Sequence, residues 1–179
     1  SASPLDAANP NATVTATNVA GSPTRADSSN ATVDSVAPTV SDGRISISGA
    51  SGTAGAYKIG DTVTATCNNT AGGDNNSDSI SSVTVNFAQF GGGAAVAATN
   101  SSGTWTATYT ITAGSIDNAS RNVSVTATDN AGNATTTSDS SNATVDNIRP
   151  TASSIAVNGT PTAGATSIAF TVAFSEPVG

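Results

Sequence analysis

The chain of 179 residues carries 12 acidic and 5 basic side chains, so its net charge at neutral pH is −7, and only 9% of its residues are charged. The chain contains no histidine, so it cannot form a Ser–His–Asp triad or a histidine-ligated zinc site. The acidic balance argues against nucleic-acid binding. No apolar run reaches the roughly 18 residues that a membrane-spanning helix needs.

Alternation of apolar residues with threonine and serine predicts seven strands in the central part of the chain. These strands cover residues 44–48, 61–67, 82–87, 94–98 (weak), 104–112, 122–128 and 134–145, with a break near Ser140. Gly, Asn, Asp and Ser separate them, and no helical period appears. Seven short antiparallel strands in about 110 residues are typical of an immunoglobulin-like sandwich.

The inward positions of these strands define the expected core. Trp105 is expected at its centre, with Tyr109, Phe87 and Phe90 nearby. Cys67, the single cysteine, falls on an inward position, so we expect a small core side chain and not a reactive thiol. The other inward residues are expected to be Ile45, Ile47, Val63, Ala65, Val83, Val85, Ala107, Ile111, Val123, Val125 and Ala127.

An internal repeat organises the whole chain. Residues 11–21 (NATVTATNVAG) resemble residues 122–132 (NVSVTATDNAG) at an offset of 111. Residues 27–34 and 139–146 are both DSSNATVD, at an offset of 112. This spacing is one ordinary domain length, and it indicates domains joined in tandem.

The repeat divides the chain into a C-terminal part of one unit at 1–36, a complete unit at 37–148 and an N-terminal part of a following unit at 149–179. The two end pieces together are shorter than one period, so we expect the chain to be a segment of a longer array. The fold class predicted is therefore all-β, with tandem immunoglobulin-like β-sandwiches, one complete and two partial.

Four segments carry a resemblance to a known class of proteins. They are GTWTATYTITAGS (103–115), NVSVTATDNAGN (122–133), VDNIRPT (145–151) and AFTVAFSEPV (169–178). These segments resemble the immunoglobulin-like repeats of large prokaryotic surface proteins, which include archaeal surface-layer (S-layer) proteins and giant bacterial adhesins. The resemblance implies an extracellular structural module at the cell surface, repeated in tandem, often with calcium within or between units.

Glycosylation sequons are about twice as frequent as chance predicts from the Ser and Thr content, which suggests N-linked glycans. The alternative is that Asn, Ser and Thr are common turn and strand residues that the repeat has copied. Archaeal surface layers use this sequon and most bacterial adhesins do not, which favours the archaeal type. Asn68, Asn100 and Asn118 are expected in exposed turns, whereas Asn122 begins a strand. The ten candidates are Asn11, Asn30, Asn68, Asn75, Asn100, Asn118, Asn122, Asn133, Asn142 and Asn158.

A first candidate calcium site lies in the loop after the second strand. Asp74, Asn76 and Asp78 place oxygen-bearing side chains at alternate positions, as in the first half of a calcium loop. An EF-hand is excluded, because Ser79 stands where that loop needs glycine and Val85 where it needs glutamate. The alternative is an exposed polar loop.

A second candidate lies at the junctions between units. Asp34 and Asp146 precede the linker prolines, and Asp61 and Asp129 lie in loops at the ends of the sandwich. Carboxylates that meet at a junction repel each other unless a cation or water separates them, so Ca²⁺ would fit there. The alternative is that these residues are ordinary turn formers.

The sequence thus favours an extracellular structural protein, an S-layer building block without enzymatic activity. Its expected partners are copies of itself and cations, because an acidic surface enriches cations. The alternative is the stalk or ligand-binding region of a bacterial adhesin. An accessory module of a secreted hydrolase is favoured less, because no catalytic constellation is visible.

Overall fold

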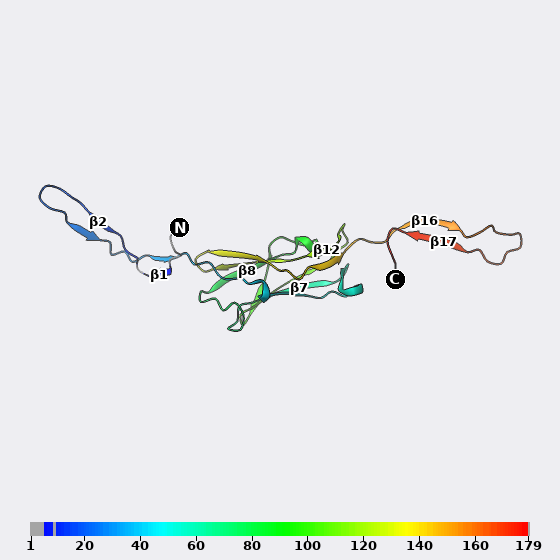
Figure 1. Cartoon of the computed structure of the whole chain (residues 1–179), viewed down its shortest axis with the longest axis horizontal. Coiled ribbons are helices and arrows are strands. Elements are labelled where there is room, and N and C mark those ends of the chain that lie inside the picture. Colours follow the sequence, from blue (N-terminus) through cyan, green and yellow to red (C-terminus); the bar gives the residue numbers. More distant parts are fainter. Residues whose placement is uncertain (1–5, 9, 179) are drawn as a thin grey trace.

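The computed structural model describes residues 6–8 and 10–178, and the all-β prediction is confirmed. Figure 1 shows a central body with a two-stranded hairpin projecting from each end. The helical segments of the described residues are the single 3₁₀ turns Asp42–Arg44, Thr53–Gly55 and Ala88–Phe90. None of them is long or apolar enough to cross a membrane.

The strands follow one another along the chain in several small sheets. They are β1 (Asp6–Ala8), β2 (Thr13–Thr15), β3 (Thr24–Ala26), β4 (Thr32–Asp34), β5 (Ile45–Ser48), β6 (Tyr57–Lys58), β7 (Thr62–Asn68), β8 (Ile80–Asn86), β9 (Val96–Ala97), β10 (Thr99–Ser101), β11 (Thr104–Thr110), β12 (Asp117–Arg121), β13 (Ser124–Asp129), β14 (Ala134–Ser138), β15 (Ala143–Asp146), β16 (Ala152–Val157) and β17 (Phe170–Phe174).

Two four-stranded sheets form most of the central body. Their strand orders are β10-β11-β7-β5 and β14-β13-β8-β9. The alternate apolar side chains of β7, β8, β11 and β13 join a single hydrophobic cluster; on β8 the alternation begins at Val83, and on β11 it ends with half-buried Tyr109. The alternation arises because successive side chains of a strand point to opposite faces. The predicted inward residues are buried as expected, except Ile47 and Tyr109, which are half-buried.

The aromatic residues meet away from the predicted centre. Phe87 and Phe90 are completely buried, Tyr57 packs edge-on against Phe90 at 5.5 Å, and Phe87 lies 6.0 Å from the ring of Tyr109. Trp105 belongs to the same core, but at 8% exposure it is the most exposed member. Placing Trp105 at the centre was therefore wrong: it sits four residues before Tyr109 on β11, opposite Cys67, away from the aromatic pairs.

A third sheet, of order β12-β15-β6, closes the side of the central body. Strand β15 is antiparallel to β12 and parallel to β6, where Val145 lies opposite Tyr57 and Asp146 opposite Lys58. Strands β6, β10 and β12 are not predicted from the sequence pattern. Two-residue β6 has no room for a pattern, and β12 is polar and almost wholly exposed, so tertiary pairing rather than hydrophobic alternation creates these strands.

The two end hairpins bury almost nothing. At the N-terminal end, β1 pairs with β4 and β2 with β3, in one long hairpin that turns back at residues 18–21. At the C-terminal end, β16 pairs with β17 across the loop 158–169. Every described residue of β16 and β17 is exposed.

The repeat in the sequence is also a repeat of strand pairing. Asp6 lies opposite Asp34 in the N-terminal hairpin, as Asp117 lies opposite Asp146 in the central body. Thr15 and Thr24 share a hydroxyl hydrogen bond of 2.8 Å, and the equivalent pair Thr126 and Thr136 shares one of 2.7 Å. Valines at equivalent positions differ sharply: Val14 is 71% exposed, whereas Val125 is completely buried.

Candidate functional site

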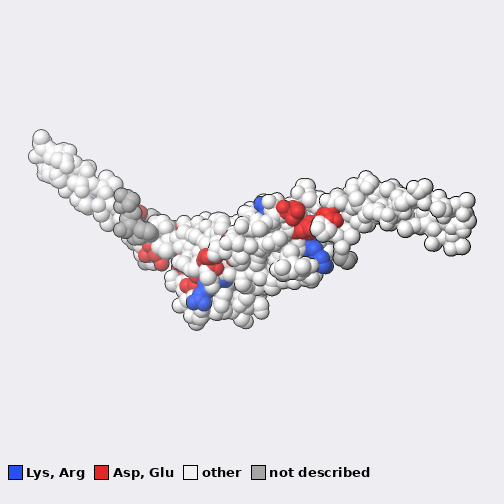
Figure 2. Space-filling view, turned by 45° about the vertical axis from the view of Figure 1, so that its right-hand side comes forward, with Lys and Arg blue, Asp and Glu red and all other residues white. Residues whose placement is uncertain are grey.

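Acidic side chains gather where the N-terminal hairpin meets the central body, and again at the opposite end (Figure 2). At the first junction the side-chain amide of Asn133 donates to Asp129 at 2.9 Å and to the backbone oxygen and carboxylate of Asp34 at 3.3 Å each. Asn133 therefore connects the turn after β13 with the end of β4.

Asp129 is a buried carboxylate that closes its own turn. One of its oxygens accepts hydrogen bonds from the backbone N–H groups of Ala131, Gly132 and Asn133, at 2.7 to 2.9 Å. Burial by itself would raise the pKa of Asp129, but the hydrogen bonds from Asn133, Gly132 and Ala131 outweigh it and lower this pKa. The site is thus built to keep Asp129 ionised.

Asp78 interacts with the same acidic residues, but its pKa is shifted in the opposite direction from that of Asp129. Its pKa is raised, first by burial and then by the negative charges of Asp34, Asp6 and Asp129. Asp6 and Asp34 also lie directly opposite each other, a cross-strand pairing of like charges that is destabilising. The first junction therefore holds negative charge that the described hydrogen bonds do not neutralise.

The loop predicted to bind calcium holds the linker that enters the central body. Asp74 accepts the N–H of Ser41 at 3.1 Å, and Asn76 accepts the N–H of Thr39 at 2.6 Å. The amide nitrogen of Asn76 donates back to the carbonyl of Thr39 at 2.9 Å and to Asn69 at 2.8 Å. Asp74 and Asn76 therefore fix the backbone of the linker at Thr39 and Ser41 through hydrogen bonds.

Asp61 and Asp146 lie at the other end of the central body. Asp61 accepts the N–H and the hydroxyl of Ser51 at 2.9 and 2.5 Å, and the N–H of Lys58 at 3.0 Å. Burial would raise its pKa, but these hydrogen bonds and the charge of Lys58 lower the pKa to about 2. Asp146 accepts the N–H of Ile148 at 3.1 Å, just before the C-terminal hairpin.

The seven predicted calcium ligands are therefore divided between the two ends. Among the residues that the structure describes, no group of three or more His, Cys, Asp or Glu side chains is arranged to hold a metal ion. Asp6 and Asp117, the cross-strand partners of Asp34 and Asp146, are not among the predicted calcium ligands. The repeat itself could have shown them, because these two residues are related by the same offset of 111.

The predicted glycosylation sequons occupy different environments. The side-chain amide of Asn122 donates to Asn142 at 2.9 Å, and that of Asn11 donates to Asn30 at 3.5 Å. The amide of Asn133 donates to Asp129 at the first junction. The expectation that Asn68, Asn100 and Asn118 lie in turns was wrong, because all three lie in strands, and Asn68 is half-buried. The exposed sequon residues are Asn11, Asn30, Asn75, Asn100, Asn118, Asn142 and Asn158.

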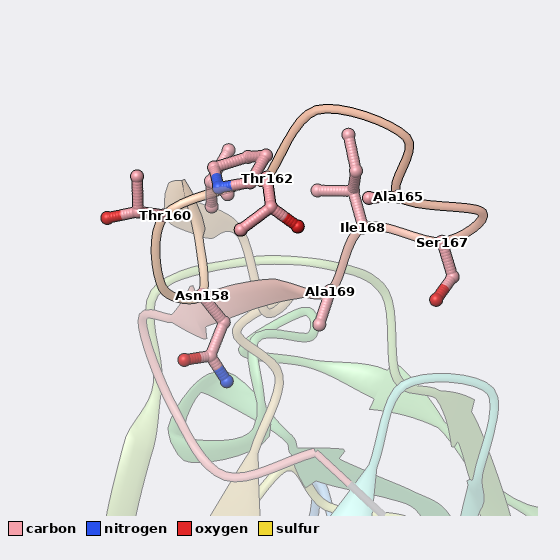
Figure 3. A pocket seen from close by; sticks show the side chains of 9 residues that line it. Asn158, Thr160, Thr162, Ala165, Ser167, Ile168 and Ala169 are labelled. Carbon is pink, nitrogen blue, oxygen red and sulfur yellow. The ribbon is translucent and has the colours of Figure 1, made fainter.

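A hollow of about 270 Å³ lies in the loop of the C-terminal hairpin (Figure 3). Its polar side chains are amides and hydroxyls, such as Asn158, Thr162 and Ser167, and Ile168 and Ala169 contribute apolar surface.

Cys67 lies in the core, where burial, with a smaller contribution from the charge of Asp74, raises the pKa of its thiol to about 11. It is therefore protonated and unreactive near neutral pH.

Comparison of the chain with protein families, with curated proteins and with solved structures finds no match.

Proposed function

We propose that residues 37–148 form a complete immunoglobulin-like sandwich, flanked by parts of two further units at 1–36 and 149–179. Two four-stranded sheets that share one hydrophobic cluster support the sandwich. The recurrence of the Asp–Asp and Thr–Thr pairs at the repeat offset supports the division into units.

The proposed function is that of a structural cell-surface protein, an S-layer building block made of such repeats and without enzymatic activity. The observation that carries this proposal is the recurrence of the same strand pairs in residues 6–34 and 117–146. A protein that repeats one rigid unit along its chain gains length and spacing, which are the properties that a lattice or stalk requires.

The outer faces of the sheets are suited to an extracellular surface. They carry rows of threonine and serine whose hydroxyls pair across strands, as in Ser46–Thr66 at 2.7 Å and Thr62–Thr110 at 3.2 Å. These pairs are neutral, so changes of pH or salt outside a cell leave them intact. Glycans on exposed sequons would extend this hydrophilic surface.

Cations are the second proposed partner, with Ca²⁺ as the ion. The support is the uncompensated charge of Asp6, Asp34, Asp78 and Asp129 at the first junction. A divalent cation there would relieve the repulsion and stiffen the connection between hairpin and central body.

Immunogold labelling and electron cryotomography of native cells test the proposed function. Antibodies raised against residues 37–148 are expected to label a periodic layer over the whole cell envelope. Sparse fibres carrying the label would favour the alternative, an adhesin stalk. Label confined to the cell interior would overturn both.

A further inference from the structure

The side chain of Asn133 joins the N-terminal hairpin to the central body. Its amide donates to the backbone oxygen and to the carboxylate of Asp34, at 3.3 Å each, and to the carboxylate of Asp129 at 2.9 Å. The two bonds to Asp34 are longer than a usual N–H···O hydrogen bond, whereas the bond to Asp129 is of ordinary length. Asn133 is therefore held firmly by the central body and only weakly by the hairpin.

The segment across which the two parts can change their angle is short. On the hairpin side, Asp34 accepts the N–H of Val36 at 3.0 Å. On the other side, Pro38 is buried, and Asn76 holds Thr39 through hydrogen bonds of 2.6 and 2.9 Å. The angle is therefore set across residues 35–37, and Asn133 links the two sides of this segment.

Four carboxylates surround the link (Figure 2). Asp6 and Asp34 lie opposite each other in the hairpin. Asp129 lies opposite Ile80 in the central body, so Asp78, two residues before Ile80, approaches the same turn. Burial, and then the charges of the other three carboxylates, raise the pKa of Asp78, and no cationic side chain is among the charged groups that act on it.

The repulsion between these carboxylates acts across residues 35–37. Asp6 and Asp34 belong to the hairpin, whereas Asp78 and Asp129 belong to the central body. When the hairpin closes on the central body, like charges approach one another, so their repulsion opposes the weak bonds of Asn133 to the hairpin.

The acidic pair of the hairpin also has an equivalent in the central body. Asp117 lies opposite Asp146 there, in a sheet where β15 has a partner on each side. The pairing of Asp6 with Asp34 is thus a feature of the repeat, and we expect it to persist when further strands complete the preceding unit.

We propose that residues 35–37 form an acid-closed hinge, in which Asn133 holds the closed state and repulsion between the two pairs of carboxylates opens it at neutral pH. The closed state binds protons more tightly, so its population rises as the pH falls from 7 towards 4. Added salt closes the hinge at pH 7, because it screens the repulsion. The inference rests on the proposed division into units and is independent of the proposed place at the cell surface.

Double electron–electron resonance on the full chain tests the hinge, with spin labels on Val19→Cys and Ala97→Cys. Both positions are exposed and lie outside the acidic cluster, and Cys67 is buried and does not compete for the label. EDTA is present throughout. At pH 7 and a Debye length of about 30 Å, the label-to-label distances are expected to be broadly distributed. At pH 4, or at pH 7 with a Debye length of about 3 Å, they are expected to narrow to one peak.

Three variants separate the parts of the hinge. Asp78→Asn is expected to raise the ratio of closed to open molecules at pH 7 about two- to fivefold, the effect of one exposed charge interaction. Asn133→Ala keeps all four carboxylates but loses the link, so its distribution is expected to stay broad at pH 4. Asp117→Asn is the matched control, because it removes one carboxylate of the equivalent pair at the opposite end and should behave like the wild type.

A wild-type distribution that is the same at pH 7 and pH 4 would overturn the proposal. A wild-type response to acid in Asn133→Ala, or no change at pH 7 in Asp78→Asn, would do the same. Fluorescence of Trp105, the single tryptophan, shows in the same samples that each variant is folded. Because EDTA removes Ca²⁺, failure here leaves the proposed calcium binding and the immunogold test of the proposed function untouched.

Discussion

Truncating the same valine in the two copies of the octapeptide measures what the central core contributes. Val145 is completely buried, and Val33 is 37% exposed in a two-stranded hairpin. Val145→Ala removes two carbon atoms, worth about 0.8 kcal/mol each on transfer, and leaves a cavity, so we expect a loss of about 2–3 kcal/mol. Val33→Ala should cost less than about 0.5 kcal/mol, because Val33 is partly exposed and packs against little else.

Urea unfolding followed by fluorescence suits this comparison, because Trp105 is the single tryptophan of the chain and lies in the central core. The midpoint of Val145→Ala should fall at unchanged slope, and its melting temperature should fall by about 10 °C. Val125→Ala and Val14→Ala form a second matched pair. Equal losses for Val33→Ala and Val145→Ala would refute the assignment of the core to the central body.

Four other outcomes are expected. Asp61 has a folded-state pKa of about 2 against an ordinary 3.8, so it stabilises the fold above about pH 4, and urea midpoints should drop between about pH 4 and 2 less steeply in Asp61→Asn than in the wild type. The pKa of Asp78 is raised, so its charge opposes folding; Asp78→Asn should raise the melting temperature at pH 7 in low salt, and this gain should shrink in high salt. Glycopeptide mass spectrometry of native material should find glycans at exposed Asn118 and none at Asn133, whose amide is hydrogen-bonded; the reverse occupancy would contradict the geometry. Millimolar Ca²⁺ should raise the melting temperature of the chain and EDTA should reverse the rise, whereas equal temperatures would leave the acidic residues as turn formers.

The long strands of the central body could be predicted because each buries one face. Val63, Ala65 and Cys67 alternate with threonine, and all three are buried on β7. The same rule fails for β12, which is held by pairing with β15 and has no buried face of its own. It also misjudged Trp105, since inward direction on a strand does not tell how far along the core a residue lies.

The sequence predicts where the acidic residues of the candidate site lie better than it predicts what they bind. Asp61 lies in the loop directly before β7, as predicted, whereas Asp129, also predicted in a loop, is the last residue of strand β13. Their hydrogen-bond partners are backbone N–H groups from tight turns, and the sequence does not encode which donors converge on a carboxylate. The contact between Asn133 and Asp34 spans 99 residues, so only the folded chain brings them together.

The third sheet determines how the molecule responds to tension along its length. The chain enters the central body through the clamp of Asn76 on Thr39 and leaves it directly from β15, and its two end hairpins project in opposite directions (Figure 1). Force applied between the two linkers that enter and leave the central body would therefore load β15 lengthwise against β12 on one side and β6 on the other. In this shear geometry the hydrogen bonds on both sides of β15 resist together instead of opening one by one. The resistance of the central body to such a force therefore depends on how strongly β15 is paired. Its two partners, β12 and β6, are short strands with almost no hydrophobic pattern.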